Sequence, residues 1–176
     1  MSKSDLMIDR SRFEVLAQDF LSELFRDLSE KNIEVKKEWQ IDHLCYRVDS
    51  LARYQQLKME FADFAELLIE SEVNGRLIST FKLYESIKFR DWSIGVVELP
   101  APKISKPTIE GFEHVEVVVD IPFSEIEAKY SHLRLDRGGL LKTLNPELEI
   151  VLGLRNIKFH HMTLEQVIDF EKAQAH

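Results

Sequence analysis

The sequence predicts an α+β fold in which an N-terminal helix precedes two βαβββ modules. Three observations predict it: an amphipathic stripe over residues 11–30, a strand and helix order that occurs twice around a proline-rich stretch, and a histidine on the first strand of each copy. The expected division is a helical segment at 1–40, a first module at 41–100, a linker at 101–109, and a second module with a C-terminal helix at 110–176.

The stripe on the first segment consists of large apolar residues at three- and four-residue spacing: Phe13, Leu16, Phe20, Leu24 and Leu28. Asp9 or Ser11 is suited to cap this helix. Because the stripe is wide, the helix is expected to pack on the rest of the chain, and a contact in a homodimer is the alternative.

The first module is predicted from alternating apolar patterns and one tight turn. Asn74-Gly75 is typical of a two-residue hairpin turn with positive φ. The expected elements are a strand at 41–48, a helix at 51–65, and strands at 65–72, 76–84 and 92–99.

The second module repeats this order after the linker. Gln166 stands three residues after Thr163, which is the spacing of a capping box. The expected elements are a strand at 112–119, a helix at 123–134, strands at 139–144, 148–152 and 156–161, and a last helix at 163–173.

Composition narrows the class of protein. The chain has 176 residues, a net charge of −8 and a single cysteine, and no apolar run long enough to span a membrane. Nucleic-acid-binding domains usually carry a basic face, so neither a nucleic acid nor a membrane is an expected partner. One cysteine excludes an internal disulfide framework. A cytoplasmic protein is the simplest interpretation.

The first strands of the two modules each have one apolar and one polar face. On the second strand Val115 and Val117 alternate with His114 and Glu116, and His43 is the matching histidine on the first. A face that carries His and Glu is costly to bury without partners, so it is expected to line a polar cleft. If the two strands are equivalent, two imidazoles meet there, which is the beginning of a metal site.

These residues resemble those of a known family. The matching segments are Asp42-His43, Asn74-Gly75-Arg76, Val97-Glu98-Leu99-Pro100, the stretch 110–116, and Ile157-Lys158-Phe159-His160. They resemble the bacterial YecM family, within the vicinal oxygen chelate superfamily of glyoxalase I, extradiol dioxygenases and methylmalonyl-CoA epimerase. The resemblance implies a cup-shaped, half-open barrel of mixed sheet.

The resemblance also implies a metal held by the first and last strand of each module. Those positions correspond here to His43, Glu98, His114 and His160. Imidazole and carboxylate ligands suit Zn, Ni, Fe(II) or Mn. His161 lies beside His160 on the opposite face of a strand, and a one-residue slip would exchange them. We expect His160 in the cleft and His161 buried toward the helices.

Other residues on the same faces have two interpretations each. Arg47 and Glu116 either form an internal ion pair, or Arg47 holds a substrate carboxylate or phosphate while Glu116 acts as a general base. Arg76, next to the hairpin, is a further candidate for substrate binding. Cys45 is interpreted as inert core rather than a nucleophile.

Asp42 and Glu113 are expected to point away from the cleft, since regular strand alternation places them opposite the histidines. They are not expected to be ligands.

Three functions are compatible with these features. The first is a metal-dependent isomerase, lyase or dioxygenase acting on a small oxygen-rich molecule. The second is a non-catalytic module that holds a small ligand in the same cup. The third is a structural or partner-binding protein, for which the helix at 11–30 is the supporting feature.

Overall fold

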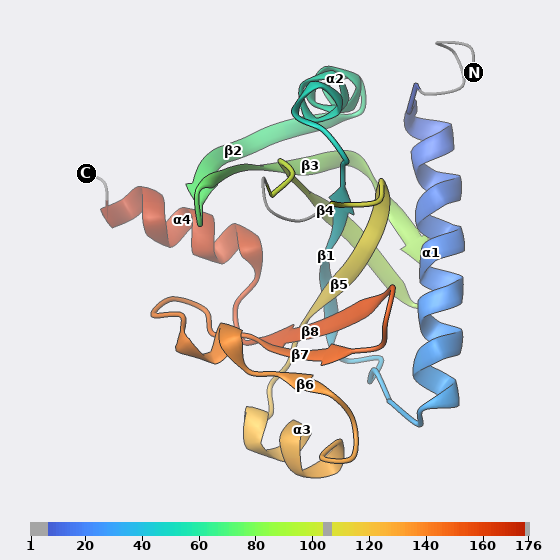
Figure 1. Ribbon diagram of the computed structural model, residues 1–176, viewed down its shortest axis with the longest axis vertical. Helices are drawn as coiled ribbons and strands as arrows, with labels where there is room; N and C mark the ends of the chain where they lie inside the picture. The colour runs from blue at the N-terminus through green and yellow to red at the C-terminus, as the bar shows by residue number, and fades with distance from the viewer. Residues whose placement is uncertain (1–6, 104–106, 175–176) are drawn as a thin grey trace.

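One eight-stranded mixed sheet organises the computed structural model, which describes residues 7–103 and 107–174 (Figure 1). The strand order is β2-β3-β4-β1-β5-β8-β7-β6, and the outermost strands do not pair with each other. The strands are β1 (Gln40–Arg47), β2 (Ala65–Val73), β3 (Arg76–Phe89), β4 (Trp92–Pro100), β5 (Gly111–Val118), β6 (Leu135–Asp136), β7 (Leu148–Val151) and β8 (Asn156–His160). The predicted α+β fold with a half-open sheet is confirmed.

The two central strands join the two halves of the sheet. β1 and β5 pair antiparallel, whereas β4 lies parallel to β1 and β8 lies parallel to β5. The strand order is therefore the same when read outward from either central strand. The two halves are related about the point where Leu44 faces Val115, so His43 faces Glu116 and His114 faces Cys45 across the β1–β5 pair.

The helices frame the sheet on several sides (Figure 1). They are α1 (Arg10–Glu30), α2 (Leu51–Phe61), α3 (Phe123–Lys129) and α4 (Leu164–Gln174). Among the described residues, no helix is long and apolar enough to cross a membrane.

Aromatic side chains fill the space between α1, α2 and the apolar face of the central strands. Phe13 of α1 lies 5.2 Å from Phe61 of α2 and 5.3 Å from Phe112 of β5, between ring centroids. Tyr46 of β1 packs edge-on against Phe112 at 4.9 Å. These contacts attach the predicted N-terminal helix to the sheet and make it part of the core.

The segment 139–144 is the main difference from the predicted elements. It is not a strand: a short 3-10 helix covers Gly138–Leu141, and β6 comes earlier at Leu135–Asp136. The Asp136 side chain accepts a hydrogen bond from the Gly138 amide, which turns the chain. A Cβ atom on Gly139 would collide with the Glu147 side chain and backbone, so this close approach requires glycine.

The helix ends also differ in detail. α3 ends at Lys129 rather than at residue 134. The capping box before α4 forms as predicted, because Thr163 Oγ1 accepts from the Gln166 amide at 3.1 Å and Gln166 Oε1 accepts from the Thr163 amide at 2.8 Å.

Candidate metal centre

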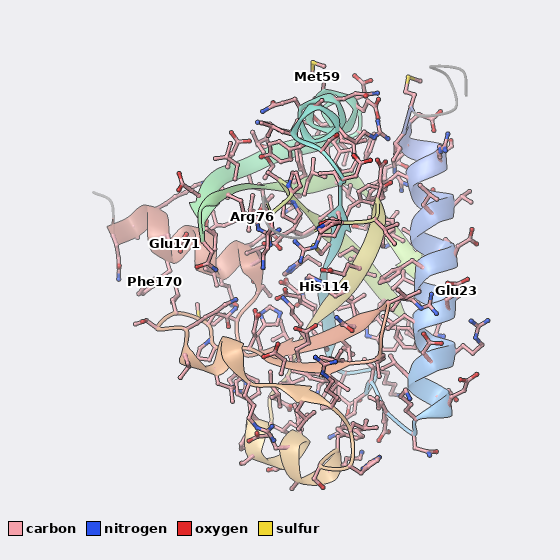
Figure 2. All side chains as sticks on the ribbon, viewed as in Figure 1. Glu23, Met59, Arg76, His114, Phe170 and Glu171 are labelled. Atoms are coloured by element: carbon pink, nitrogen blue, oxygen red, sulfur yellow. The ribbon has the colours of Figure 1, made fainter. Side chains whose placement is uncertain are left out.

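The polar faces of the central strands line a cavity of ≈ 1280 Å³. Arg76, His114 and Glu171 of α4 all line this cavity, and their side chains are labelled in Figure 2. The opposite faces, which include Leu44 and Val115, are buried in the apolar core. The predicted division into an apolar and a polar face therefore holds for both strands.

A β-bulge interrupts each central strand directly before its histidine. Ile41 and His43 face consecutive residues of β5, which leaves Asp42 as the extra residue. On β5, His114 and Phe112 face consecutive residues of β1, which leaves Glu113 as the extra residue. The two bulges are equivalent, since each extra residue directly precedes the histidine of its strand.

The bulges turn the two acidic residues toward the histidines that follow them. Asp42 Oδ2 lies 2.8 Å from His43 Nδ1, and Glu113 Oε2 lies 3.1 Å from His114 Nδ1. The expectation that these carboxylates point away is wrong, because it assumed uninterrupted alternation. A carboxylate can only accept here, so each Nδ1 carries a proton and Nε2 is the atom left to bind a ligand.

Both Nε2 atoms converge on one carboxylate. Glu116 Oε1 lies 3.5 Å from His43 Nε2 and 3.2 Å from His114 Nε2. Glu98 Oε2 is 3.7 Å from His43 Nε2, so a second carboxylate reaches the same point. The two histidines are each only 2 % exposed. Side chains from β1, β4 and β5 thus meet in one small buried volume.

The imidazoles at this point are short of hydrogen bonds. Within the described residues, Nε2 of His43, His114 and His160 is buried and has no hydrogen-bond partner. Buried polar atoms are nearly always satisfied, so three such atoms in one cluster call for a ligand. Ligand atoms of His43, Glu98 and Glu116 all lie within 4.8 Å of one another, as those of Asp42, His43 and His160 do.

His43 and Glu116, whose Nε2 and Oε1 atoms lie 3.5 Å apart, shift each other's pKa in opposite directions. Burial lowers the pKa of His43, but the carboxylates of Glu116, Asp42 and Glu98 outweigh it and raise this pKa well above its ordinary value. Burial raises the pKa of Glu116, but His43, Lys158 and His114 lower it further, well below its ordinary value. The pair therefore holds a positive charge beside a negative one.

β8 supplies a lysine at the position that corresponds to Glu98. Cys45 stands two residues after His43 and pairs with Glu98, whereas Glu116 stands two residues after His114 and pairs with Lys158. The expectation that His160 matches Glu98 is therefore wrong in register, since His160 is two residues further along β8. Lys158 Nζ lies 3.3 Å from Glu116 Oε1 and 3.2 Å from Glu147 Oε1.

His160 nevertheless faces the centre and His161 does not. His160 is 1 % exposed, and its Nε2 lies 3.7 Å from Asp42 Oδ2 and 4.0 Å from Glu116 Oε2. His161 follows the end of β8, where its exposed ring stacks on Phe123. The preference for His160 in the cleft is right, whereas the expected burial of His161 is wrong because the strand ends before it.

The two predicted arginines also reach the cavity. Arg47 donates from Nε and Nη2 to Glu113 Oε2, each at 2.6 Å, so its carboxylate partner is Glu113 and not Glu116. Arg76 donates to the Ala101 carbonyl at 3.3 Å and lines the same cavity. Burial and the nearby charge of Arg47 lower the pKa of Arg76. Two guanidinium groups thus lie at the side of the cavity formed by β1 and β3.

Four residues of the site were not predicted as site residues from sequence: Asp42, Glu113, Lys158 and Asn145, whose Nδ2 lies 2.8 Å from His160 Nδ1. An acidic residue directly precedes the histidine in both Asp42-His43 and Glu113-His114, and this repeated pair is the sequence signal that could have identified Asp42 and Glu113. Cys45 lies buried beside Glu113 and His114, with ligand atoms within 4.8 Å of theirs.

Comparisons with known proteins agree with the predicted family. The family model described as YecM protein matches residues 12–171. Protein YecM of Escherichia coli strain K12 is 30 % identical over 147 residues, which cover 75 % of this chain and 78 % of that protein. An uncharacterised protein of Haemophilus influenzae is 33 % identical over 114 residues, and the match covers 65 % of this chain and 56 % of that protein's length.

The structural-genomics protein EC4020 has the same fold and superposes with a TM-score of 0.75 at 24 % identity, covering 97 % of this chain and 98 % of that one. Methylmalonyl-CoA epimerase of Streptomyces coelicolor gives a TM-score of 0.47 at 14 % identity, covering 69 % of this chain and 96 % of that one.

Proposed function

This chain belongs to the YecM family, and we propose that it binds a divalent cation. The proposed ligands are His43, His114, Glu98 and Glu116. The observation that carries the proposal is the convergence of two buried, carboxylate-oriented Nε2 atoms on Glu116 Oε1, at 3.5 and 3.2 Å. Each separation is that between neighbouring ligands of one first-row metal ion. His43 groups within 4.8 Å with Glu98 and Glu116, and His114 groups with Cys45 and Glu113, so the approach of both imidazoles to one cation is part of the proposal.

The residues fit a borderline divalent cation such as Zn, Ni, Fe(II) or Mn. Two neutral imidazole nitrogens and two carboxylates are the donors these ions share, and the buried Nε2 atoms lack other partners among the described residues. Asp42 and Glu113 fix the orientation of the two rings from behind, as outer partners of ligating histidines commonly do. When bound, the cation supplies Lewis-acid polarisation of a ligand oxygen.

Glu116 fits the role of a ligand better than the role of a general base. Its pKa is held well below the ordinary value by His43, Lys158 and His114 despite burial. An efficient base needs a pKa near the working pH. Its oxygen also lies beside both imidazoles, where a coordinating atom is required.

The cavity is large enough for a small-molecule ligand. A volume of ≈ 1280 Å³ lined by Arg47 and Arg76 accommodates a small, oxygen-rich and acidic ligand. The guanidinium groups of Arg47 and Arg76 would orient such a ligand. We propose a metal-dependent isomerase-, lyase- or dioxygenase-like activity on such a ligand.

A second candidate function is ligand binding without turnover. Lys158 favours it, because an ammonium group stands at the strand position that corresponds to Glu98. In this case an acidic ligand binds to chelator-treated protein, whereas in the first case binding requires added metal.

The test is metal analysis of protein purified without chelator, then stripped and titrated with Zn, Ni, Mn or Fe(II). We expect about one cation per chain and a loss of binding in His43→Ala and His114→Ala. His161→Ala is the matched control, since its exposed ring lies outside the cavity on Phe123. Binding that is unchanged in folded His43→Ala and His114→Ala protein contradicts the proposal.

A further inference from the structure

We infer that His160 presents its Nε2–H group to the cavity as a hydrogen-bond donor for an oxygen of the bound ligand, and that it does not coordinate the cation. The orientation of the ring follows from the structure alone. The identity of the oxygen as part of a metal-bound ligand rests on the proposed function.

The orientation of the Asn145 side chain is fixed by a backbone amide and carbonyl. The Met162 amide donates to Asn145 Oδ1 at 3.0 Å, and Asn145 Nδ2 donates to the Met162 carbonyl at 3.0 Å. A main-chain amide can only donate and a main-chain carbonyl can only accept, so the oxygen and nitrogen of this side chain cannot be exchanged.

The fixed side chain decides the tautomer of His160. Asn145 Nδ2 lies 2.8 Å from His160 Nδ1. Because Nδ2 is a donor, Nδ1 must accept, and the proton of the neutral ring is then on Nε2.

This arrangement is the reverse of that at the other two histidines. His43 and His114 have carboxylates at Nδ1, which hold a proton there and make Nε2 the nitrogen that a cation can bind once it displaces the proton on that atom. His160 has an amide at Nδ1, which leaves a proton on Nε2. A cation binds the first kind of nitrogen and is repelled by the second.

The Nε2–H of His160 lacks an acceptor in the described part of the chain. The nearest carboxylate oxygens are Asp42 Oδ2 at 3.7 Å and Glu116 Oε2 at 4.0 Å, beyond the usual hydrogen-bond distance. The ring is 1 % exposed. A buried donor without a partner is costly, and an oxygen of a ligand in the cavity satisfies it.

A small oxyanion with two neighbouring oxygens can bind the cation and also accept a hydrogen bond from His160. One oxygen binds the cation and the other accepts from His160. Oxalate is the probe we select for this class, because it offers such a pair and lacks other functional groups.

The tautomer is tested first in metal-free protein by ¹⁵N NMR of the histidine side chains near neutral pH. We expect a protonated Nε2 on His160, identified by its loss in His160→Gln. A protonated Nδ1 and unprotonated Nε2 on His160 would falsify the inference, whether or not the protein binds metal.

The donor role is tested by metal titration followed by oxalate titration of His160→Ala and His160→Gln. We expect metal affinity within about threefold of the wild type in both, and a loss of oxalate affinity of about tenfold or more in His160→Ala. His160→Gln keeps an N–H donor and should lose less. A loss of metal in His160→Ala as large as in His43→Ala contradicts the inference, and so does unchanged oxalate affinity.

Asn145→Asp reverses the direction of the hydrogen bond between residue 145 and His160 Nδ1 and supplies a second test. Asn145 has a φ of +49°, a conformation that aspartate also tolerates. A carboxylate there accepts from Nδ1 and moves the lone pair of His160 to Nε2. We expect metal affinity to rise and oxalate affinity to fall in a folded variant; equal changes of both in one direction contradict the inference.

Discussion

Asp42 and Glu113 occupy equivalent β-bulges on the two central strands, and each carboxylate binds the Nδ1 atom of the histidine that follows it. The bulge moves the carboxylate behind the ring while the ring stays on the polar face. The two strands thereby direct the Nε2 atoms of both imidazoles at one point.

The first prediction concerns this outer pair. Glu113→Ala should lower metal affinity by roughly 10- to 100-fold, because His114 loses the group that fixes its tautomer and orientation. Glu66→Ala is the control, since Glu66 is an exposed carboxylate on β2. Calorimetric titration with zinc measures both. Equal affinities of the two variants would show that the outer carboxylate does not orient the ligand.

The second prediction concerns the ammonium group beside Glu116. Lys158→Met should raise metal affinity by roughly tenfold, because a positive charge next to the cation is removed. It should also destabilise the metal-free protein, since Glu116 and Glu147 lose a partner at 3.3 and 3.2 Å.

Lys142→Met is the matched control for this change. Lys142 also pairs with Glu147, at 2.6 Å, so its loss removes a partner of the same carboxylate without removing the charge next to Glu116. Thermal unfolding with and without metal gives both quantities. Weaker metal binding in Lys158→Met would contradict the predicted sign.

The third prediction is that metal binding releases protons. A cation and a proton compete for the same Nε2 atoms, and despite burial the neighbouring anionic groups raise the pKa of His43 well above its ordinary value and that of His114 to about 10. Affinity should therefore fall as the pH is lowered from about 10 to about 6, with release on the order of two protons near neutral pH. Titration in buffers of different ionisation enthalpy measures the release. Binding heats that are independent of the buffer would argue against imidazole ligands.

The fourth prediction concerns acid stability away from the site. Glu70 accepts from Tyr54 at 2.6 Å and Ser79 at 2.8 Å and pairs with Lys58. The ammonium group of Lys58 and the Tyr54 hydroxyl lower the pKa of Glu70 from 4.5 to about 2. A lowered carboxyl pKa contributes stability above about pH 4.5, and this contribution is lost as the pH falls toward about 2.

Glu70→Gln should therefore be less stable than the wild type at neutral pH, and the difference should shrink below about pH 3. Urea unfolding at the two pH values measures it, with Glu66→Gln as the control on the same strand. If the two proteins differ in stability by the same amount at both pH values, the carboxylate charge is not the cause of the difference.

Local sequence patterns determined the repeated βαβββ order and the polar faces of the two central strands. His43, Cys45 and Arg47 alternate with apolar residues, and burial of the apolar set places these three on the cavity side. The acidic-histidine pair that recurs at His43 and His114 made the two strands comparable before any pairing was known.

The tertiary structure alone decided which atoms meet. Strand pairing shifts by one residue at Asp42 and at Glu113, and this register depends on a partner strand that is distant in the chain. The same pairing sets Lys158, and not His160, at the position that corresponds to Glu98. The tautomer of His160 depends on Asn145 and Met162, which contact each other only after β8 and the preceding loop have folded together. Periodicity assigns a residue to a face, but hydrogen bonds between distant segments assign each proton and lone pair.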